Sequence, residues 1–169
     1  MKKLILFFAL LSSIFAQASE LTLDEKASLW TLKIISESQM EILQDNVKKV
    51  QKIEEYYNSL GRFSFNKKRK LKAQNCGIIQ SSVAANLIML LSSFEDSKEA
   101  LKKIDLTDED HNEFTESFNQ FIKSSLYADK KCGDIEKSSD AYERAYLEFK
   151  NAFEILNSYL PVFETETTK

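Results

Sequence analysis

The chain has 169 residues, of which 43% are hydrophobic and 29% are charged, and its formal net charge is −3. Its three glycines and one proline are too few for the tight turns of a sheet-rich fold, and its acidic balance disfavours nucleic acid as a partner. One histidine and two cysteines fall short of a typical zinc site, so we expect no metal or other cofactor.

Residues 1–18 have the pattern of a signal peptide. Lys2 and Lys3 precede an apolar run over residues 4–15, and the small residues Ala16 and Ala18 follow it. The run is shorter than the roughly 20 residues that cross a bilayer as a helix. We therefore expect cleavage and export, most simply to a bacterial periplasm and alternatively to the outside of the cell, with no transmembrane span in the mature chain.

Four stretches of the mature chain carry apolar residues three and four positions apart, which is typical of amphipathic helices. Capping residues and helix breakers set their bounds at about residues 22–60, 66–104, 107–131 and 134–160. We expect residues 19–161 to form one all-α domain, an antiparallel up-down-up-down four-helix bundle. Residues 162–169 follow Pro161 and are predicted to form a flexible tail.

The helix lengths predict how the helices align, because an α-helix rises about 1.5 Å per residue. Counting along the second and third helices places Cys132 within roughly 4.5 Å of the level of Cys76, so we expect a disulfide between them. The third and fourth helices end at this level. The first and second helices continue for roughly 18 Å as a longer, projecting hairpin.

The predicted end of this hairpin concentrates cations and aromatic residues, and we call it the hairpin tip. Its members are Arg62, Phe63, Phe65, Lys67, Lys68, Arg69, Lys70 and Lys72. Such a segment suits an acidic protein or an anionic envelope surface, with the phenylalanines entering the interface. The alternative is a solvated helix end whose phenylalanines fold back on Tyr56, Tyr57 and Leu60. The opposite end, residues 105–116, is acidic.

The sequence also allows predictions for two groups of residues near the expected core. Trp30 is expected to lie level with Phe114 and Phe118 in an aromatic layer. Gln80 and Asn86 lie on or beside the apolar face of the second helix. They are either hydrogen-bonded core residues or the lining of a small-ligand pocket between the second, third and fourth helices.

Residues for catalysis are scarce. His111 is the only histidine, and the pair Asp108–His111 is half of the motif that di-iron bundles use twice. The attachment motif of a c-type haem is missing, and no nucleophile motif accompanies His111. We therefore predict a non-enzymatic interaction protein of the bacterial envelope, an adaptor, inhibitor or chaperone-like module that acts through the hairpin tip. The alternative is a periplasmic small-ligand carrier.

Overall fold

A computed structural model describes residues 21–160 of the chain. Within that range there are four α-helices and no strand, namely α2 (Leu23–Ser59), α3 (Phe65–Leu101), α4 (Asp108–Lys130) and α5 (Ile135–Tyr159). The prediction of an all-α four-helix bundle is confirmed. The predicted signal peptide, Pro161 and the predicted tail lie outside the described residues.

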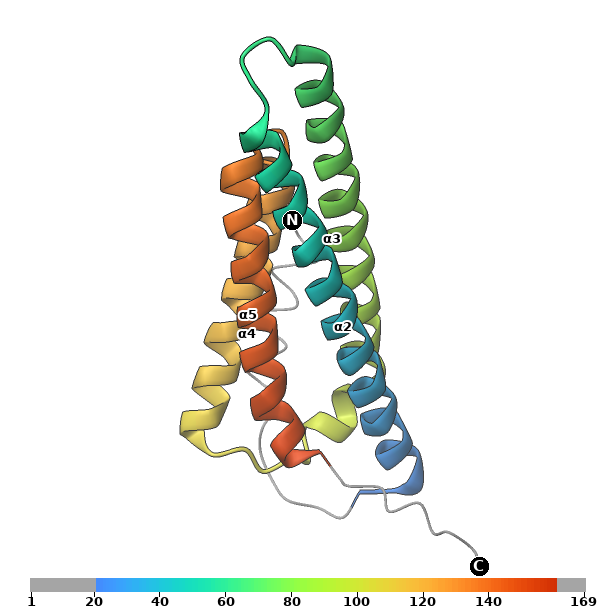
Figure 1. Ribbon diagram of the computed structural model, residues 1–169. Coiled ribbons are helices and arrows are strands. Elements are labelled where there is room, and N and C mark those ends of the chain that lie inside the picture. Colours follow the sequence, from blue (N-terminus) through green and yellow to red (C-terminus); the bar gives the residue numbers. More distant parts are fainter. Residues whose placement is uncertain (1–20, 161–169) are drawn as a thin grey trace, which may run out of the picture.

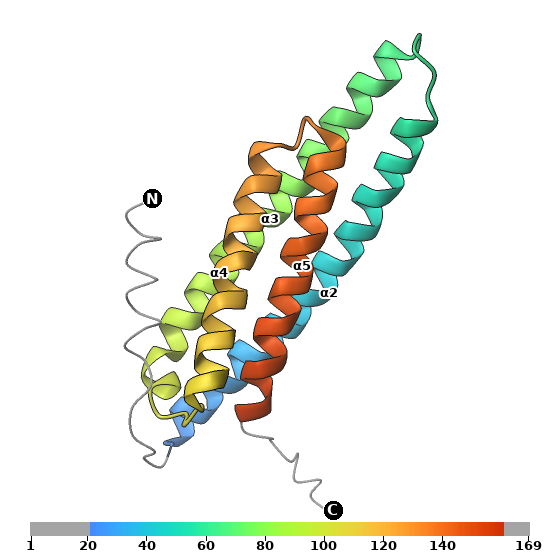
Figure 2. The same cartoon turned by 90° about the vertical axis from the view of Figure 1, so that its left-hand side faces the viewer.

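The helices form two hairpins that pack against each other. Figures 1 and 2 show consecutive helices running in opposite directions, with α2 beside α3 and α4 beside α5. Between the hairpins, α2 contacts α5 and α3 contacts α4. Because α2 and α3 have 37 residues each while α4 and α5 have 23 and 25, the α2–α3 hairpin extends past the α4–α5 turn, as Figure 2 shows.

The ends of the helices follow the capping signals in part. The Thr22 hydroxyl accepts from the Glu25 amide at 3.3 Å, and the Glu25 carboxylate accepts from the Thr22 amide at 2.8 Å, which closes a capping box on α2. Thr107 caps α4 as predicted, accepting from the Asp110 amide at 3.1 Å. At the end of α2 the chain leaves the helix through Leu60 in an extended conformation, and Gly61, which follows, does not have a left-handed backbone.

Aromatic rings fill the core at the level where all four helices meet. Their centroids lie 4.5–6.2 Å apart, and the rings belong to Phe94, Phe114, Phe118, Phe121, Phe149 and Phe153. Trp30 does not pack in the buried core as expected, since its side chain is 50% exposed. The buried face of α2 is held by Leu29 and Leu32, and Trp30 points about 100° away from Leu29 around the helix.

α3 is the one helix among residues 21–160 whose length and composition meet the criterion for a membrane span. Its uncharged stretch runs over residues 73–94, so α3 is long enough and apolar enough to cross a bilayer, although the apolar part over residues 83–91 alone is too short. Core helices of water-soluble bundles meet the same criterion. Here α3 packs against both α2 and α4.

Candidate functional site

The hairpin tip presents its two phenylalanines to solvent. Phe63 lies in the loop between α2 and α3 and is 97% exposed, and Phe65 begins α3 and is 75% exposed. The alternative in which these rings fold back on α2 is therefore not what the structure adopts. Exposed aromatic rings at the end of a hairpin are unusual for a surface that contacts only water, because each ring leaves a large apolar area unburied.

The cations of the hairpin tip form few contacts with other residues of the chain. Among the described residues, none of the six forms an ion pair with a carboxylate. Two of them contact the ring of Tyr57 instead, with the Lys68 ammonium 4.9 Å and the Lys72 ammonium 5.7 Å from the ring centroid. These contacts leave the other four cations in solvent.

The position of the cations also opposes the stability of α3. The N-terminus of a helix carries a partial positive charge and favours acidic side chains. The first turn of α3 has no acidic residue, and its N-cap Ser64 makes no side-chain capping bond, yet Lys67, Lys68 and Arg69 lie within its first two turns. Helix stability therefore does not account for this concentration of positive charge.

A hollow of about 410 Å³ lies between α2 and α3 below the hairpin tip, and we call it the hairpin groove. Four of its lining residues are mainly apolar, namely Ile53, Tyr56, Leu71 and Ile78, and three are polar or cationic, namely Lys49, Lys52 and Gln74. Sequence reasoning missed Lys49 and Lys52. The signal that points to them is their spacing of three residues on α2, which places both on one side of that helix.

A disulfide joins the base of the projecting hairpin to the other half of the bundle. Cys76 of α3 is bonded to Cys132 in the turn between α4 and α5, with the Cα atoms 4.7 Å apart. The predicted pair is therefore found in the structure. Residues 65–75 of α3 lie beyond it, which at 1.5 Å per residue is about 16 Å of helix.

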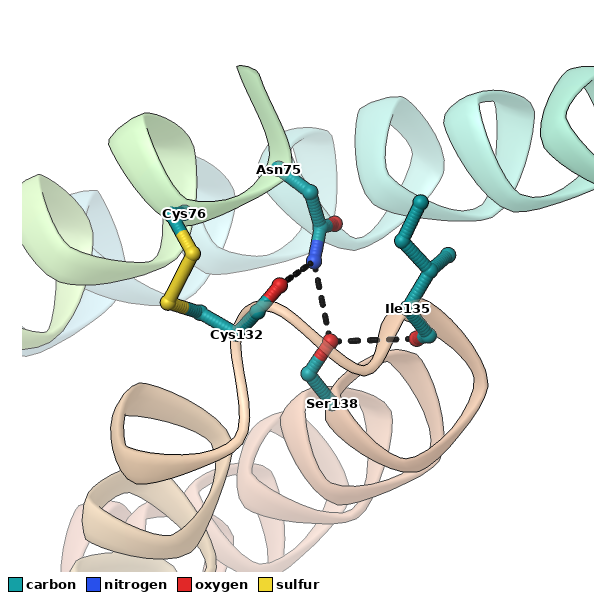
Figure 3. The surroundings of a disulfide bond; sticks show 5 residues. All are labelled: Asn75, Cys76, Cys132, Ile135 and Ser138. Carbon is teal, nitrogen blue, oxygen red and sulfur yellow. Dashed lines mark hydrogen bonds between the residues drawn. A yellow bond between two sulfur atoms is a disulfide. The ribbon is translucent and has the colours of Figure 1, made fainter. Parts of the chain in front are cut away.

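A buried asparagine reinforces this junction, as Figure 3 shows. The Asn75 amide nitrogen donates to the Cys132 carbonyl at 2.8 Å and to the Ser138 hydroxyl at 2.9 Å. Ser138 in turn donates to the Ile135 carbonyl at 3.0 Å. The side chain of Ile135 packs with Ile53 and Leu71 in a small apolar cluster separate from the main core. Sequence reasoning did not identify Asn75, whose one indication was its place beside Cys76.

The residues of the predicted ligand pocket are not brought together. Gln80 is exposed, whereas Asn86 is 2% exposed and donates to the Ser82 carbonyl at 2.7 Å and to the Ser82 hydroxyl at 3.0 Å. Tyr142 of α5 donates to the same Ser82 hydroxyl, so these side chains form a buried polar cluster in the bundle. Burial raises the pKa of the Tyr142 phenol.

Two carboxylates near the acidic end of the bundle, those of Glu25 and Asp110, form contacts within the chain. The Glu25 carboxylate lies 2.7 Å from the Lys103 ammonium, and the hydrogen bond from Lys103 lowers the pKa of Glu25. Tyr159 donates to Asp110, and this bond, followed by one from Thr107, lowers the pKa of Asp110. Within residues 21–160 there is no group of three potential metal ligands among His, Cys, Asp and Glu.

Comparison with protein-family models, with curated proteins and with solved structures finds no match to this chain.

Proposed function

We propose that this chain is an exported, non-enzymatic interaction protein of the bacterial envelope whose hairpin tip and hairpin groove bind an acidic segment of a partner protein. The observation that carries the proposal is the pair of exposed rings, Phe63 and Phe65, beside six cations that form no ion pair within residues 21–160. The bundle serves to hold this surface away from its own core.

Both components of the surface gain from a partner. Burying a phenylalanine side chain contributes about 1.5–3 kcal/mol, so the two rings supply the apolar anchors of an interface. The cations supply orientation and speed of encounter, because a concentrated positive patch attracts acidic partners and repels basic ones. A carboxylate-rich segment with a few apolar residues therefore complements the hairpin tip.

The hairpin groove favours a protein segment over a lipid surface. A flat bilayer reaches the end of the hairpin, where Phe63 lies, and leaves a hollow farther down the side unfilled. A peptide or helix that contacts Phe63 and Phe65 continues into the hairpin groove, where Tyr56, which is 48% exposed, meets its apolar side chains while Lys49 and Lys52 meet its carboxylates.

A charge-matched pair of variants tests the proposal. The tip variant carries Lys67→Gln, Lys68→Gln, Arg69→Gln and Lys70→Gln. The control variant loses the same charges at exposed positions elsewhere, with Lys26→Gln, Lys123→Gln, Lys130→Gln and Arg144→Gln. A photo-crosslinking amino acid at position 65 first captures the partner in the intact envelope, and the purified pair is then titrated by calorimetry.

We expect the tip variant to bind the captured partner at least about tenfold more weakly than the control variant, and we expect its residual binding to depend less on salt. Equal affinities of the two variants would overturn the proposal. Vesicles of phosphatidylglycerol form a separate arm of the experiment. Binding to vesicles that depends on the tip, without capture of a protein, would replace the protein partner by an anionic membrane.

A further inference from the structure

One side of α3 is both exposed and free of charge. No Asp, Glu, Lys or Arg occurs over residues 73–94, and 39% of an 18-residue apolar segment of α3 is buried in the structure. The exposed side carries residues at spacings of three and four, namely Gly77, Ser81, Ala84, Ile88 and Ser92. Ile88 is 67% exposed and its neighbour Met89 is 43% exposed. This spacing is that of a seam between packed helices, and we call these residues the α3 seam.

Gly77 has no role that the rest of the described chain explains. A Cβ atom built on it meets nothing within 4 Å, and its backbone is ordinary helix. Glycine inside a helix costs about 1 kcal/mol relative to alanine. A glycine on an exposed helix face allows another backbone or a large side chain to approach closely, which gives the residue a use in a contact between molecules.

Charges of opposite sign continue the α3 seam at its two ends. Lys67 and Lys70 extend it toward the hairpin tip, and Glu95 and Glu99 extend it toward the other end of α3, all four being exposed. The midpoint between Lys70 and Glu95 and the midpoint between Lys67 and Glu99 both fall at residue 82 or 83. A second α3 running antiparallel about that point therefore pairs each lysine with a glutamate of the other copy.

The same two-fold axis also places a large side chain of one copy opposite a small residue of the other along the α3 seam. Gly77 and Ile88 have their midpoint at the same place as the charged pairs, so the exposed Ile88 of one copy lies opposite Gly77 of the other. Ser81 and Ala84, which are small, lie at the two-fold axis, where the two helices approach most closely. A parallel arrangement would instead place lysine against lysine and glutamate against glutamate.

We propose that the chain forms a symmetric homodimer in which the α3 seams of two copies pack antiparallel. The occupant of the face is thus a second copy of this chain, selected by its self-complementary charges. Phe63 and Phe65 lie beyond the contact, whereas Lys67 and Lys70 belong to both the α3 seam and the hairpin tip. Ile88→Glu changes the α3 seam and leaves the hairpin tip intact, so it separates the failure of this inference from the failure of the proposed function. In the dimer the two hairpin tips point in opposite directions.

The first test is the mass of the protein in solution, measured by sedimentation equilibrium on the full chain produced under oxidising conditions. We expect a dimer that Ile88→Glu converts to a monomer with an unchanged helical circular dichroism spectrum, because Ile88 is outside the core. A chain that is monomeric up to about 1 mM, the limit of a weak complex, overturns the inference whether or not the face then binds vesicles or another protein. A dimer that survives Ile88→Glu also overturns it.

A charge exchange tests the antiparallel arrangement. Lys70→Glu and Glu95→Lys, made singly, are each expected to raise the dissociation constant about tenfold, which corresponds to about 1.4 kcal/mol over the two symmetric pairs. The double variant restores both pairs with reversed sign and should recover most of the affinity. Failure of the double variant to recover, while it remains folded, rules out this pairing.

Cross-linking locates the two-fold axis. Ala84→Cys should give a disulfide-linked dimer on mild oxidation, since the two copies of residue 84 lie beside the axis. Glu143→Cys, at an exposed position on α5, is the matched control and should remain monomeric under denaturing conditions. Equal cross-linking of the two variants would count against the α3 seam as the contact.

Discussion

Removal of the Cys76–Cys132 bond is the sharpest test of how the projecting hairpin is held. The two residues are 56 positions apart in the chain, and closing a loop of that length lowers the entropy of the unfolded state by an amount worth about 4 kcal/mol at 25 °C. In a domain of this size each 1 kcal/mol shifts the melting temperature by roughly 3–4 °C. We expect the double variant Cys76→Ala, Cys132→Ala to melt roughly 12–16 °C below the native chain.

The assay is thermal unfolding followed by circular dichroism at 222 nm, with and without a reducing agent. The reducing agent should lower the melting temperature of the native chain to that of the double variant and leave the double variant unchanged. If the native chain and the double variant melt within about 3 °C of each other, the loop-closure reasoning is refuted, and the hydrogen bonds of Asn75 would suffice to hold the junction.

Three further outcomes are expected. Asn75→Leu removes two buried hydrogen bonds and should lower the free energy of unfolding in urea by about 1–3 kcal/mol, whereas an unchanged urea midpoint would show that the bonds contribute nothing net. The pKa of Asp110 is lowered in the folded state, so its carboxylate adds to the free energy of unfolding above its ordinary pKa. This stabilisation is lost as the pH falls through the lowered pKa. On acidification the urea midpoint should therefore fall less in Tyr159→Phe than in the native chain. An equal fall of the urea midpoint in the two proteins would contradict this. The pKa of Tyr142 is raised above 10.0, so the folded state holds its proton longer than the unfolded state and loses stability as the pH rises beyond that value. Between pH 9 and pH 11 the free energy of unfolding should therefore fall less in Tyr142→Phe than in the native chain. An equal fall in the two proteins would contradict this.

Much of the architecture is encoded in regular distances along the chain. Apolar spacing located the four helices, and the constant rise of a helix was enough to place Cys132 beside Cys76. The rise per residue and the number of residues per turn depend on the backbone, which is nearly the same in every helix. Neighbouring side chains have little influence on them, so one sequence suffices to predict them.

The features that sequence reasoning missed depend on which face of a helix its neighbours cover. Trp30 has helical spacing from other apolar residues, yet Leu29 and Leu32 occupy the side of α2 that the bundle buries. Lys49 and Lys52 line the hairpin groove only because α3 packs against the adjacent side of α2. The rotation of each helix about its own axis determines which of its side chains are buried, and this rotation depends on the packing of all four helices together.

The exposure of Phe63 could not be predicted for a different reason. A ring in a short loop can lie on either side of it, and apolar periodicity says nothing about residues outside a helix. The buried amide of Asn75 was equally hidden, because its two acceptors are 57 and 63 residues away in the sequence.

The place of the covalent link has a mechanical consequence. A pulling force applied at Phe63 along the axis of α3 reaches the sulfur–sulfur bond before it reaches the phenylalanine rings of the core. Tension that passes from this end along α3 is therefore shared between α3 itself and a covalent link into the α4–α5 turn for as long as Cys76 and Cys132 stay bonded.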